Sequence, residues 1–253
     1  RARKAGNAVI NLIKKKITVK DILTPAAFQN AIKVHAAIGG STNALLHLPA
    51  IAHEAGYDLP LELFNEANRE IPYLTNLQPS GEYPTQFLWY AGGIPMIQWL
   101  IRDHLDLSVM TVTGQTLGEN LEELGQDSYV DRIKSYLANH KINFSDIIRS
   151  PETTKKRGSV AVLSGNLAPE HAVIKYAAVS NQDFIKKGPV VVFESEDLAY
   201  QAIIESRINP GDIVIIRNEG PRGSGMPELF MMTEAVASIP ELSSTVTLIT
   251  DGR

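Results

Sequence analysis

The sequence has 253 residues, of which 44% are hydrophobic and 21% are charged, values that are ordinary for a globular protein. Its net charge of -4, with acidic and basic residues interspersed, argues against a nucleic-acid-binding surface, which normally carries a basic excess. The absence of Cys excludes a disulfide framework, a Cys-ligated zinc site and a cysteine nucleophile within these residues. No apolar run is long enough to span a bilayer and no signal peptide is visible, so we expect a cytoplasmic protein without membrane or nucleic-acid partners.

The N-terminal part of the chain is predicted to be mainly helical. Thr24 and Pro25 form a good helix start, because Thr caps a first turn and Pro is tolerated at the first helical position. Thr116 and Glu119 have the spacing of a capping box, which indicates a helix after them. Helical spacing of apolar residues predicts further helices over residues 1–16, 26–38, 44–55, 61–70 and 127–140. Four aromatic residues are interpreted as core packing: Phe87, Trp89, Tyr90 and Trp99.

The segment 150–158 is polar and lacks periodicity, so we place a domain boundary there. The predicted division is a first domain over residues 1–150, a linker over 151–158 and a second domain over 159–253. Beyond the linker, short β-branched runs alternate with helical runs, which predicts an α/β fold with strands covered by helices or curled into a barrel-like sheet. The predicted strands are 160–163, 173–179, 190–193, 213–216 and 246–249, and the predicted helices are 196–206 and 229–237.

Residues 219–228 form a glycine loop, because three glycines and two prolines lie within these ten residues, between a predicted strand and a predicted helix. Glycine lets a ligand approach the main chain closely and proline stiffens the path, so such a loop is a common place to hold an anion or a metal-bound substrate. Glu228 closes the loop, and Asp251 follows the last predicted strand, where ligands of α/β sheets gather. The simpler interpretation makes Glu228 a first-turn helix residue and Asp251 a turn former.

Residues 39–43, which we call the GGSTN turn, open a predicted helix directly after another one. Ser41, Thr42 and Asn43 would present two hydroxyls and an amide, with backbone N–H groups, at the positive end of a helix dipole. That arrangement could cradle an anion or a carboxylate. Local sequence alone favours an ordinary capped turn, because these residue types are enriched at helix starts.

The six histidines show no metal-binding pattern. Only His47 and His53 lie close in sequence, and their spacing is not the i, i+4 pair of a zinc helix. No catalytic triad signature, Gly-x-Ser-x-Gly elbow or Walker loop is present. From the residues alone, the sequence indicates an α/β protein with an anion or metal site.

Several stretches of the sequence together resemble one family, and they occur in the order of that family. They are 39–44 (GGSTNA), 46–48 (LHL), 111–114 (TVTG), 164–169 (SGNLAP), 219–223 (EGPRG), 225–228 (GMPE) and 250–253 (TDGR). The family is the iron–sulfur dehydratases (IlvD/Edd), which include dihydroxy-acid, phosphogluconate and sugar-acid dehydratases. The resemblance runs from one end of the chain to the other.

The resemblance implies a fold and a set of site residues. The chain would be an internal fragment: the helix-rich end of an α/β N-terminal domain, followed by the start of a β-barrel-like α/β C-terminal domain. The iron–sulfur cluster would be held by Cys residues upstream, and Mg²⁺ by upstream carboxylates, a modified Lys and Glu228, the Glu of the family's Gly-Met-Pro-Glu motif. The catalytic Ser would come just after Arg253. Substrate contacts are implied for Ser41, Thr42, Asn43, Arg222, Asp251 and Arg253.

Two departures from the family pattern stand out. The family commonly has Gly where His171 stands, so the backbone there is expected to differ. The glycine loop is one residue shorter than in dihydroxy-acid members, with Ser224 where Gly-Pro is usual. Together with the 89–93 run and the helical stretch 127–148, this indicates the sugar-acid (aldonate) branch.

The implied reaction is a dehydration in which a 2,3-dihydroxy (sugar) acid becomes a 2-keto-3-deoxy acid. The cluster would act as Lewis acid on the C3 hydroxyl, and Mg²⁺ would stabilise the enolate that forms at C2. The implied partners are a small sugar acid or dihydroxy acid and further copies of the chain in a dimer or tetramer. Two alternatives remain: a fragment that is inactive without the Cys residues and the Ser, and a binding module for a carboxylated or phosphorylated metabolite.

Overall fold

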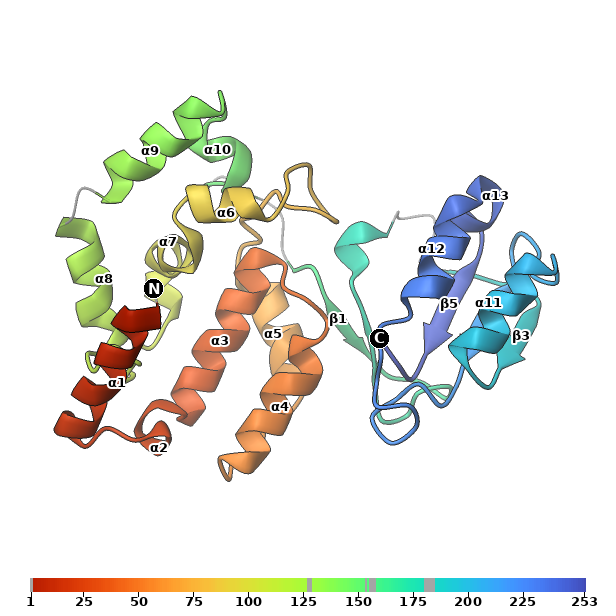
Figure 1. Cartoon of the computed structure of the whole chain (residues 1–253), viewed down its shortest axis with the longest axis horizontal. Helices are drawn as coiled ribbons and strands as arrows, with labels where there is room; N and C mark the ends of the chain where they lie inside the picture. The colour runs from red at the N-terminus through yellow and green to blue at the C-terminus, as the bar shows by residue number, and fades with distance from the viewer. Residues whose placement is uncertain (1, 127–128, 153, 155–157, 180–184) are drawn as a thin grey trace. The chain divides into compact units, whose positions relative to one another are not determined.

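The computed structural model describes residues 2–126, 129–152, 154, 158–179 and 185–253 (Figure 1). The chain divides into two compact units, residues 1–179 and 180–253. Helices combine with a two-stranded antiparallel sheet and a three-stranded parallel sheet, so the predicted α/β class is confirmed. Within the described ranges, no helix has the length and apolar character that crossing a bilayer requires.

The first unit is built mainly from helices. They are α1 Ala2–Lys15, α2 Val19–Ile22, α3 Pro25–Ile38, α4 Ala44–Glu54, α5 Glu62–Glu70, α6 Gln86–Tyr90, α7 Gly93–Leu100, α8 Leu117–Gln126, α9 Tyr129–Asn139 and α10 Phe144–Ile147, with a 3-10 turn η1 at Arg102–His104. The predicted helices are confirmed, while α2, α6, α7 and the turn η1 were not predicted. Residues 127 and 128 of the predicted helix 127–140 lie outside the described residues.

Local capping explains where these helices begin and end. The Thr24 side chain accepts a hydrogen bond from the Ala27 N–H at 3.2 Å, as predicted for the start of α3. Thr116 and Glu119 form the predicted capping box, with the Thr116 N–H on Glu119 Oε2 at 2.7 Å and the Glu119 N–H on Thr116 Oγ1 at 3.2 Å. Helix α3 ends at Gly39, which takes the left-handed conformation with φ 60°.

The core of the first unit lies between α3, α5 and α7. Ile32, Phe64 and Ile97 come from these three helices and are at most 2% exposed. Three of the four aromatic residues predicted to be core, Phe87, Tyr90 and Trp99, pack against it. The prediction is wrong for Trp89 of the short helix α6, because its side chain is 63% exposed.

A small antiparallel sheet belongs to the first unit and is held there by hydrogen bonds from α5. Its strands are β1 Ala161–Leu163 and β2 Ala172–Ile174. Asn65 of α5 binds the backbone of Val162 in both directions, at 2.8 and 2.9 Å, and Asn68 Oδ1 accepts the Ser159 N–H at 2.9 Å. The predicted strand 173–179 is wrong in its second half, because a 3-10 turn, η2 Tyr176–Ala178, replaces it.

The predicted linker 151–158 and domains 1–150 and 159–253 remain a proposal about domain organisation. Residues 153 and 155–157 of that linker lie outside the described residues. The two compact units divide later in the chain, at residues 179 and 180. The side chains of α5 account for this difference, because they fix the segment that contains β1 and β2 to the first unit.

The second unit is a parallel sheet with helices on one face (Figure 1). Its strands are β3 Val190–Phe193, β4 Ile213–Ile216 and β5 Thr247–Thr250, in the spatial order β3-β4-β5, and its helices are α11 Glu196–Ile204, α12 Phe230–Ser238 and α13 Pro240–Ser243. Val214, Ile216 and Met232 are fully buried between sheet and helices. The predicted strands and helices are confirmed here, and the described residues form an open sheet, so a barrel-like closure stays a prediction.

Candidate functional site

The glycine loop lies at the carboxyl ends of the parallel strands, as the sequence indicated. It follows β4, and Asp251 follows the neighbouring strand β5. Asp251 Oδ1 accepts the Glu219 N–H at 3.0 Å, and Oδ2 accepts the Asn218 N–H at 3.1 Å. The carboxylate proposed to bind substrate therefore also fixes the backbone at the start of the loop.

Glu219 is the buried carboxylate of this loop, with only 5% of its surface exposed. Its Oε1 accepts the backbone N–H of Glu196 at 2.6 Å, at the positive end of α11, and its Oε2 accepts the Ser224 hydroxyl at 2.5 Å. Glu219 thus ties the loop to α11 at one end and to Ser224 at the other. No cation lies within ion-pair distance of it in the described part of the chain.

The end of the loop meets the last residue of the chain. Arg253 Nη1 lies 3.4 Å from Glu228 Oε1, and Arg253 Nε donates to the Met226 carbonyl at 3.3 Å. The Leu229 N–H donates to the Arg253 carbonyl at 2.8 Å. Arg222 is exposed and makes no hydrogen bond or ion pair within the residues that the structure describes, so its guanidinium is free to meet an anion.

Several residues in and beside the glycine loop have the positive φ angles that are typical of glycine and of tight turns. Asn218 and Met226 take positive φ angles of 66° and 59°, and Gly225 takes 85°. A Cβ at Gly223 would lie 2.1 Å from the Asn218 carbonyl oxygen, so no other residue fits at that position without a backbone shift. The loop is therefore closely folded on itself.

The GGSTN turn in the first unit is the second predicted site. The Asn43 N–H donates to Ser41 Oγ at 3.3 Å, and the helix start has no side-chain cap from Asn43 itself. The capped turn favoured by local sequence is thus only partly present, because Ser41 accepts a backbone N–H while Asn43 makes no side-chain cap. In the described residues, the Thr42 hydroxyl and the Asn43 amide make no hydrogen bond, so both are available to a ligand.

Two side chains that sequence reasoning missed hold this turn. The Lys175 ammonium donates to the Gly39 carbonyl at 2.9 Å and approaches the Gly40 carbonyl at 3.5 Å. The His35 ring contacts the Ser41 carbonyl through Nε2 at 2.9 Å and is only 6% exposed. Burial lowers the pKa of the His35 imidazole, and burial also lowers the pKa of the Lys175 ammonium.

His171 stands where the resembling family commonly has Gly, and a different backbone was expected there. His171 takes φ 85°, which is the left-handed region that glycine favours. Its Nε2 lies 2.8 Å from Glu62 Oε1 on α5. The chain therefore keeps a glycine-like conformation at this position with a His side chain.

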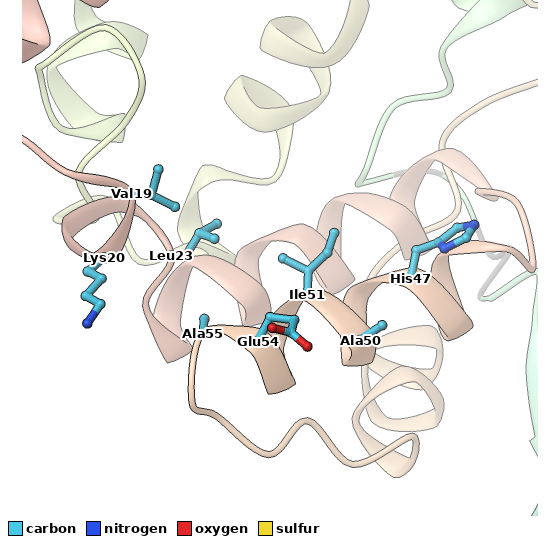
Figure 2. A pocket seen from close by; sticks show the side chains of 8 residues that line it. All are labelled: Val19, Lys20, Leu23, His47, Ala50, Ile51, Glu54 and Ala55. Carbon is cyan, nitrogen blue, oxygen red and sulfur yellow. The ribbon is translucent and has the colours of Figure 1, made fainter.

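The first unit also contains a pocket that none of the predicted site residues lines. It is a pocket of about 640 Å³ between α2 and α4, shown in Figure 2, and its walls are mostly apolar. His47, from the family-like stretch 46–48, lies at one end of it and Lys20 at the other. The described residues contain no group of three or more His, Asp or Glu side chains that could bind a metal ion.

Comparison with known protein families decides the classification. The family model described as dihydroxy-acid/6-phosphogluconate dehydratase N-terminal matches residues 1–120, and its C-terminal counterpart matches residues 146–253. The chain belongs to this dehydratase family. It is 44% identical over 256 residues to dihydroxy-acid dehydratase of Acetivibrio thermocellus, and 44% identical over 255 residues to that of Halothermothrix orenii.

These matches cover the whole chain but only part of each relative. The chain spans 43% of the length of both of these dihydroxy-acid dehydratases. A third relative, dihydroxy-acid dehydratase of Methanothrix thermoacetophila, is 41% identical over 253 residues and is covered to 44%. The family assignment made from the short motifs is therefore confirmed. Because the chain spans less than half of each relative, the activity of the whole protein remains a proposal.

The structure places the predicted site residues in two groups. Asp251, Glu228 and Arg253 meet at the glycine loop of the second unit. Ser41, Thr42 and Asn43 lie in the GGSTN turn of the first unit. Sequence analysis did not identify His35 or Lys175 as supports of the turn. A single His was interpreted as a packing or surface residue, and a single Lys belongs to no recognisable motif. The available signal was the pair Gly39 and Gly40, because two adjacent glycines indicate that other side chains pack closely against the backbone there.

Proposed function

We propose that this chain contributes to the active site of a hydro-lyase that removes water from a 2,3-dihydroxy acid and yields a 2-keto acid. The observation that carries this proposal is that models of both halves of one dehydratase family match the chain in order. The names of the relatives support a dihydroxy acid as the substrate class. The activity is proposed for the intact protein.

In this reaction the C2 proton and the C3 hydroxide leave together as water, and the resulting enol tautomerises to the 2-keto acid. The residues of the chain suit the recognition of such a substrate. Arg222 and Arg253 are cations that can pair with its carboxylate, and Asp251 can accept from a hydroxyl. In the first unit, Thr42 and Asn43 offer a hydroxyl and an amide that make no hydrogen bond within the described residues, with Ser41 beside them. The base that takes the C2 proton is expected to be the Ser that follows Arg253 in the family motif.

The iron–sulfur cluster has no ligand in this chain. Cluster irons are held mainly by Cys thiolates, and the 253 residues contain no Cys. The donor set of the chain therefore does not fit a cluster. A cluster in the intact protein requires thiolates from outside these residues.

Glu228 is the residue of this chain that we propose as a ligand of Mg²⁺. Mg²⁺ prefers oxygen donors, and the Glu228 carboxylate is 67% exposed, with a weak ion pair to Arg253 at 3.4 Å. Glu228 would provide one carboxylate oxygen. When bound, Mg²⁺ would polarise the substrate carboxylate and the C2 oxygen and so make the C2 proton more acidic.

The sugar-acid branch suggested by Ser224 and the shorter glycine loop is a narrower version of the proposal. The relatives that match the chain bear the name dihydroxy-acid dehydratase, so a simple dihydroxy acid is the better supported substrate. A dimer or tetramer is proposed as the assembly. The competing function is a binding module for a carboxylated metabolite, for which the free Arg222 and the glycine loop would suffice.

A substrate panel on the intact protein tests the proposal. Branched and unbranched 2,3-dihydroxy acids and a set of aldonic acids would be incubated with protein prepared without oxygen, and 2-keto acid formation would be measured. We expect turnover of dihydroxy acids and weaker turnover of aldonic acids. A higher kcat/KM for an aldonic acid than for the dihydroxy acids would instead support membership of the sugar-acid branch. Binding of these acids without any keto acid would support the binding module instead.

A further inference from the structure

We infer that Lys175 is a positioning residue for the GGSTN turn and thereby for the substrate oxygens that Ser41, Thr42 and Asn43 bind. This inference rests on the proposed function, because it gives Lys175 a role in binding that substrate. It adds a residue that lies 136 positions from Gly39 in sequence. Lys175 is not among the residues that the family resemblance assigned.

Among the described residues, the hydrogen bonds of the Lys175 ammonium go to backbone carbonyls. Its ammonium reaches the Gly39 carbonyl at 2.9 Å and the Gly40 carbonyl at 3.5 Å. Within the described ranges, no carboxylate forms an ion pair with it, and no other donor reaches either carbonyl. A half-buried ammonium without a carboxylate has lost hydration, so its position is set by these two carbonyls. The carbonyls in turn depend on the ammonium as their donor.

His35 holds the next carbonyl of the turn. A carbonyl can only accept, so the contact between His35 Nε2 and the Ser41 carbonyl at 2.9 Å places the proton on Nε2. Nδ1 is then the unprotonated nitrogen, and it is buried with no hydrogen-bond partner among the residues that the structure describes. Three consecutive carbonyls, those of Gly39, Gly40 and Ser41, therefore contact two side chains: Lys175, which is distant in sequence, and His35, which lies on the preceding helix α3.

Packing leaves the turn little freedom to move elsewhere. A Cβ at Gly39 would lie 2.6 Å from the Tyr73 ring, and a Cβ at Gly40 would lie 2.2 Å from the His35 ring. Both rings are buried, with Tyr73 4% and His35 6% exposed. Because the rings fix one side of the turn and Lys175 supplies the donor for its first two carbonyls, removal of the ammonium would release the segment just before Ser41.

The side chains that would bind substrate follow directly from these fixed carbonyls. In the described residues, the backbone N–H groups of Ser41 and Thr42 have no acceptor, and the Thr42 hydroxyl and Asn43 amide are equally free. A binding surface of this kind loses affinity when its groups are not held in place, because ordering them then costs binding free energy. Lys175 would act through the turn and would not touch the substrate.

The test compares Lys175→Met, Lys175→Arg and the matched control Lys33→Met in the intact protein. Lys33 also donates its ammonium to a backbone carbonyl, that of His104 at 2.8 Å, and it lies on α3 away from the turn. Amide hydrogen exchange would be measured for residues 39–43. KM and kcat would be measured with the best dihydroxy acid, and affinity would be measured with glycerate, the smallest 2,3-dihydroxy acid.

We expect Lys175→Met to speed hydrogen exchange in the turn about tenfold and to raise KM and the glycerate Kd about tenfold, as for loss of one charged hydrogen bond. The change in kcat should be smaller than the change in KM, because Lys175 would position substrate-binding groups and would not touch the reacting atoms. Lys175→Arg should restore most of the affinity, and Lys33→Met should leave exchange in the turn and KM unchanged.

Several outcomes would overturn the inference. One is that Lys175→Met matches Lys33→Met in exchange and in KM. Another is that Lys175→Met speeds exchange in the turn without changing KM or glycerate affinity. Either result removes the positioning role while leaving the proposed function intact. If wild-type protein neither binds nor converts any dihydroxy acid, the proposed function fails and the inference fails with it. Should Lys175→Met not fold, Lys175→Gln provides the same comparison.

Discussion

Asp251 and Glu219 join the carboxyl ends of two adjacent parallel strands: Asp251 Oδ1 accepts the backbone N–H of Glu219 at 3.0 Å. Its second oxygen accepts the N–H of Asn218, which has the positive φ of 66°. Gly220 packs against the same residue, since a Cβ there would lie 3.1 Å from the Asp251 carbonyl oxygen. The glycine loop is thus oriented by a residue from the strand beside it.

Removing the Asp251 carboxylate should loosen the glycine loop and destabilise the second unit. Asp251→Ala leaves two backbone N–H groups without their acceptor, and we expect the free energy of unfolding to fall by about 1–2 kcal/mol, discounted for the exposure of the site. Asp251→Asn keeps one acceptor oxygen and should lose about half as much. Urea unfolding would measure both, with Glu234→Ala on the exposed side of α12 as control. Equal stability of Asp251→Ala and Glu234→Ala would contradict this.

Much of the second unit could be predicted because its residues carry strong local signals. Val190 to Phe193 and Ile213 to Ile216 are β-branched or aromatic runs bounded by turns, and both form strands at the predicted positions. Alternation of strands with helices implies parallel neighbours, whose carboxyl ends meet at one edge of the sheet. The proximity of Asp251 to the glycine loop follows from that topology.

The support that Lys175 gives to the GGSTN turn could not be predicted, because it depends on contacts that are distant in sequence. Lys175 reaches the turn only because β2 lies beside β1, and β1 is bound by Asn65 on α5. Asparagine side chains give no periodic signal, and the predicted strand 173–179 placed Lys175 within regular structure. The short 3-10 turn after β2 shows how tertiary packing overrides a β-branched run there.

The two glycines of the turn should resist substitution for different reasons. Gly39→Ala meets both a positive φ of 60° and the Tyr73 ring, and we expect a loss of about 2–4 kcal/mol of stability. Gly40→Ala meets only the His35 ring and should lose about 1–3 kcal/mol. Gly56→Ala is the matched control, since Gly56 has φ 86° with open space around it and should lose about 1 kcal/mol. Urea unfolding that ranked Gly56→Ala as the most damaging would refute this account.

Stability of the first unit should depend on pH through His35. Burial, and then the Lys175 charge, lower the pKa of its imidazole below the ordinary value of 6.5. The unfolded chain therefore takes up the proton first as the pH falls, so the stabilisation is complete above pH 6.5 and is lost as the pH falls through 6.5 toward the folded-state pKa.

The variant His35→Gln isolates this effect. Gln keeps an N–H donor for the Ser41 carbonyl but does not titrate, so the decline in thermal stability between about pH 7.5 and pH 5 should become shallower. His53→Gln, which alters an exposed histidine of α4, is the control and should keep the wild-type slope. If His35→Gln and wild type lose stability in parallel over this range, His35 is not the group that titrates.

Glu228 should matter for metal dependence far more than for stability. Its ion pair with Arg253, at 3.4 Å and with the Glu228 side chain 67% exposed, is of the surface kind that contributes about 0–1 kcal/mol. Glu228→Gln should therefore leave urea unfolding almost unchanged. If Glu228 is a ligand of Mg²⁺ in the intact protein, the same variant should raise the Mg²⁺ concentration that gives half-maximal activity at least about tenfold, because a neutral amide is a weaker donor than a carboxylate. Glu241→Gln, on another exposed helix start in the same unit, should change neither quantity. An unaltered Mg²⁺ response in Glu228→Gln would leave Glu228 only its contact with Arg253.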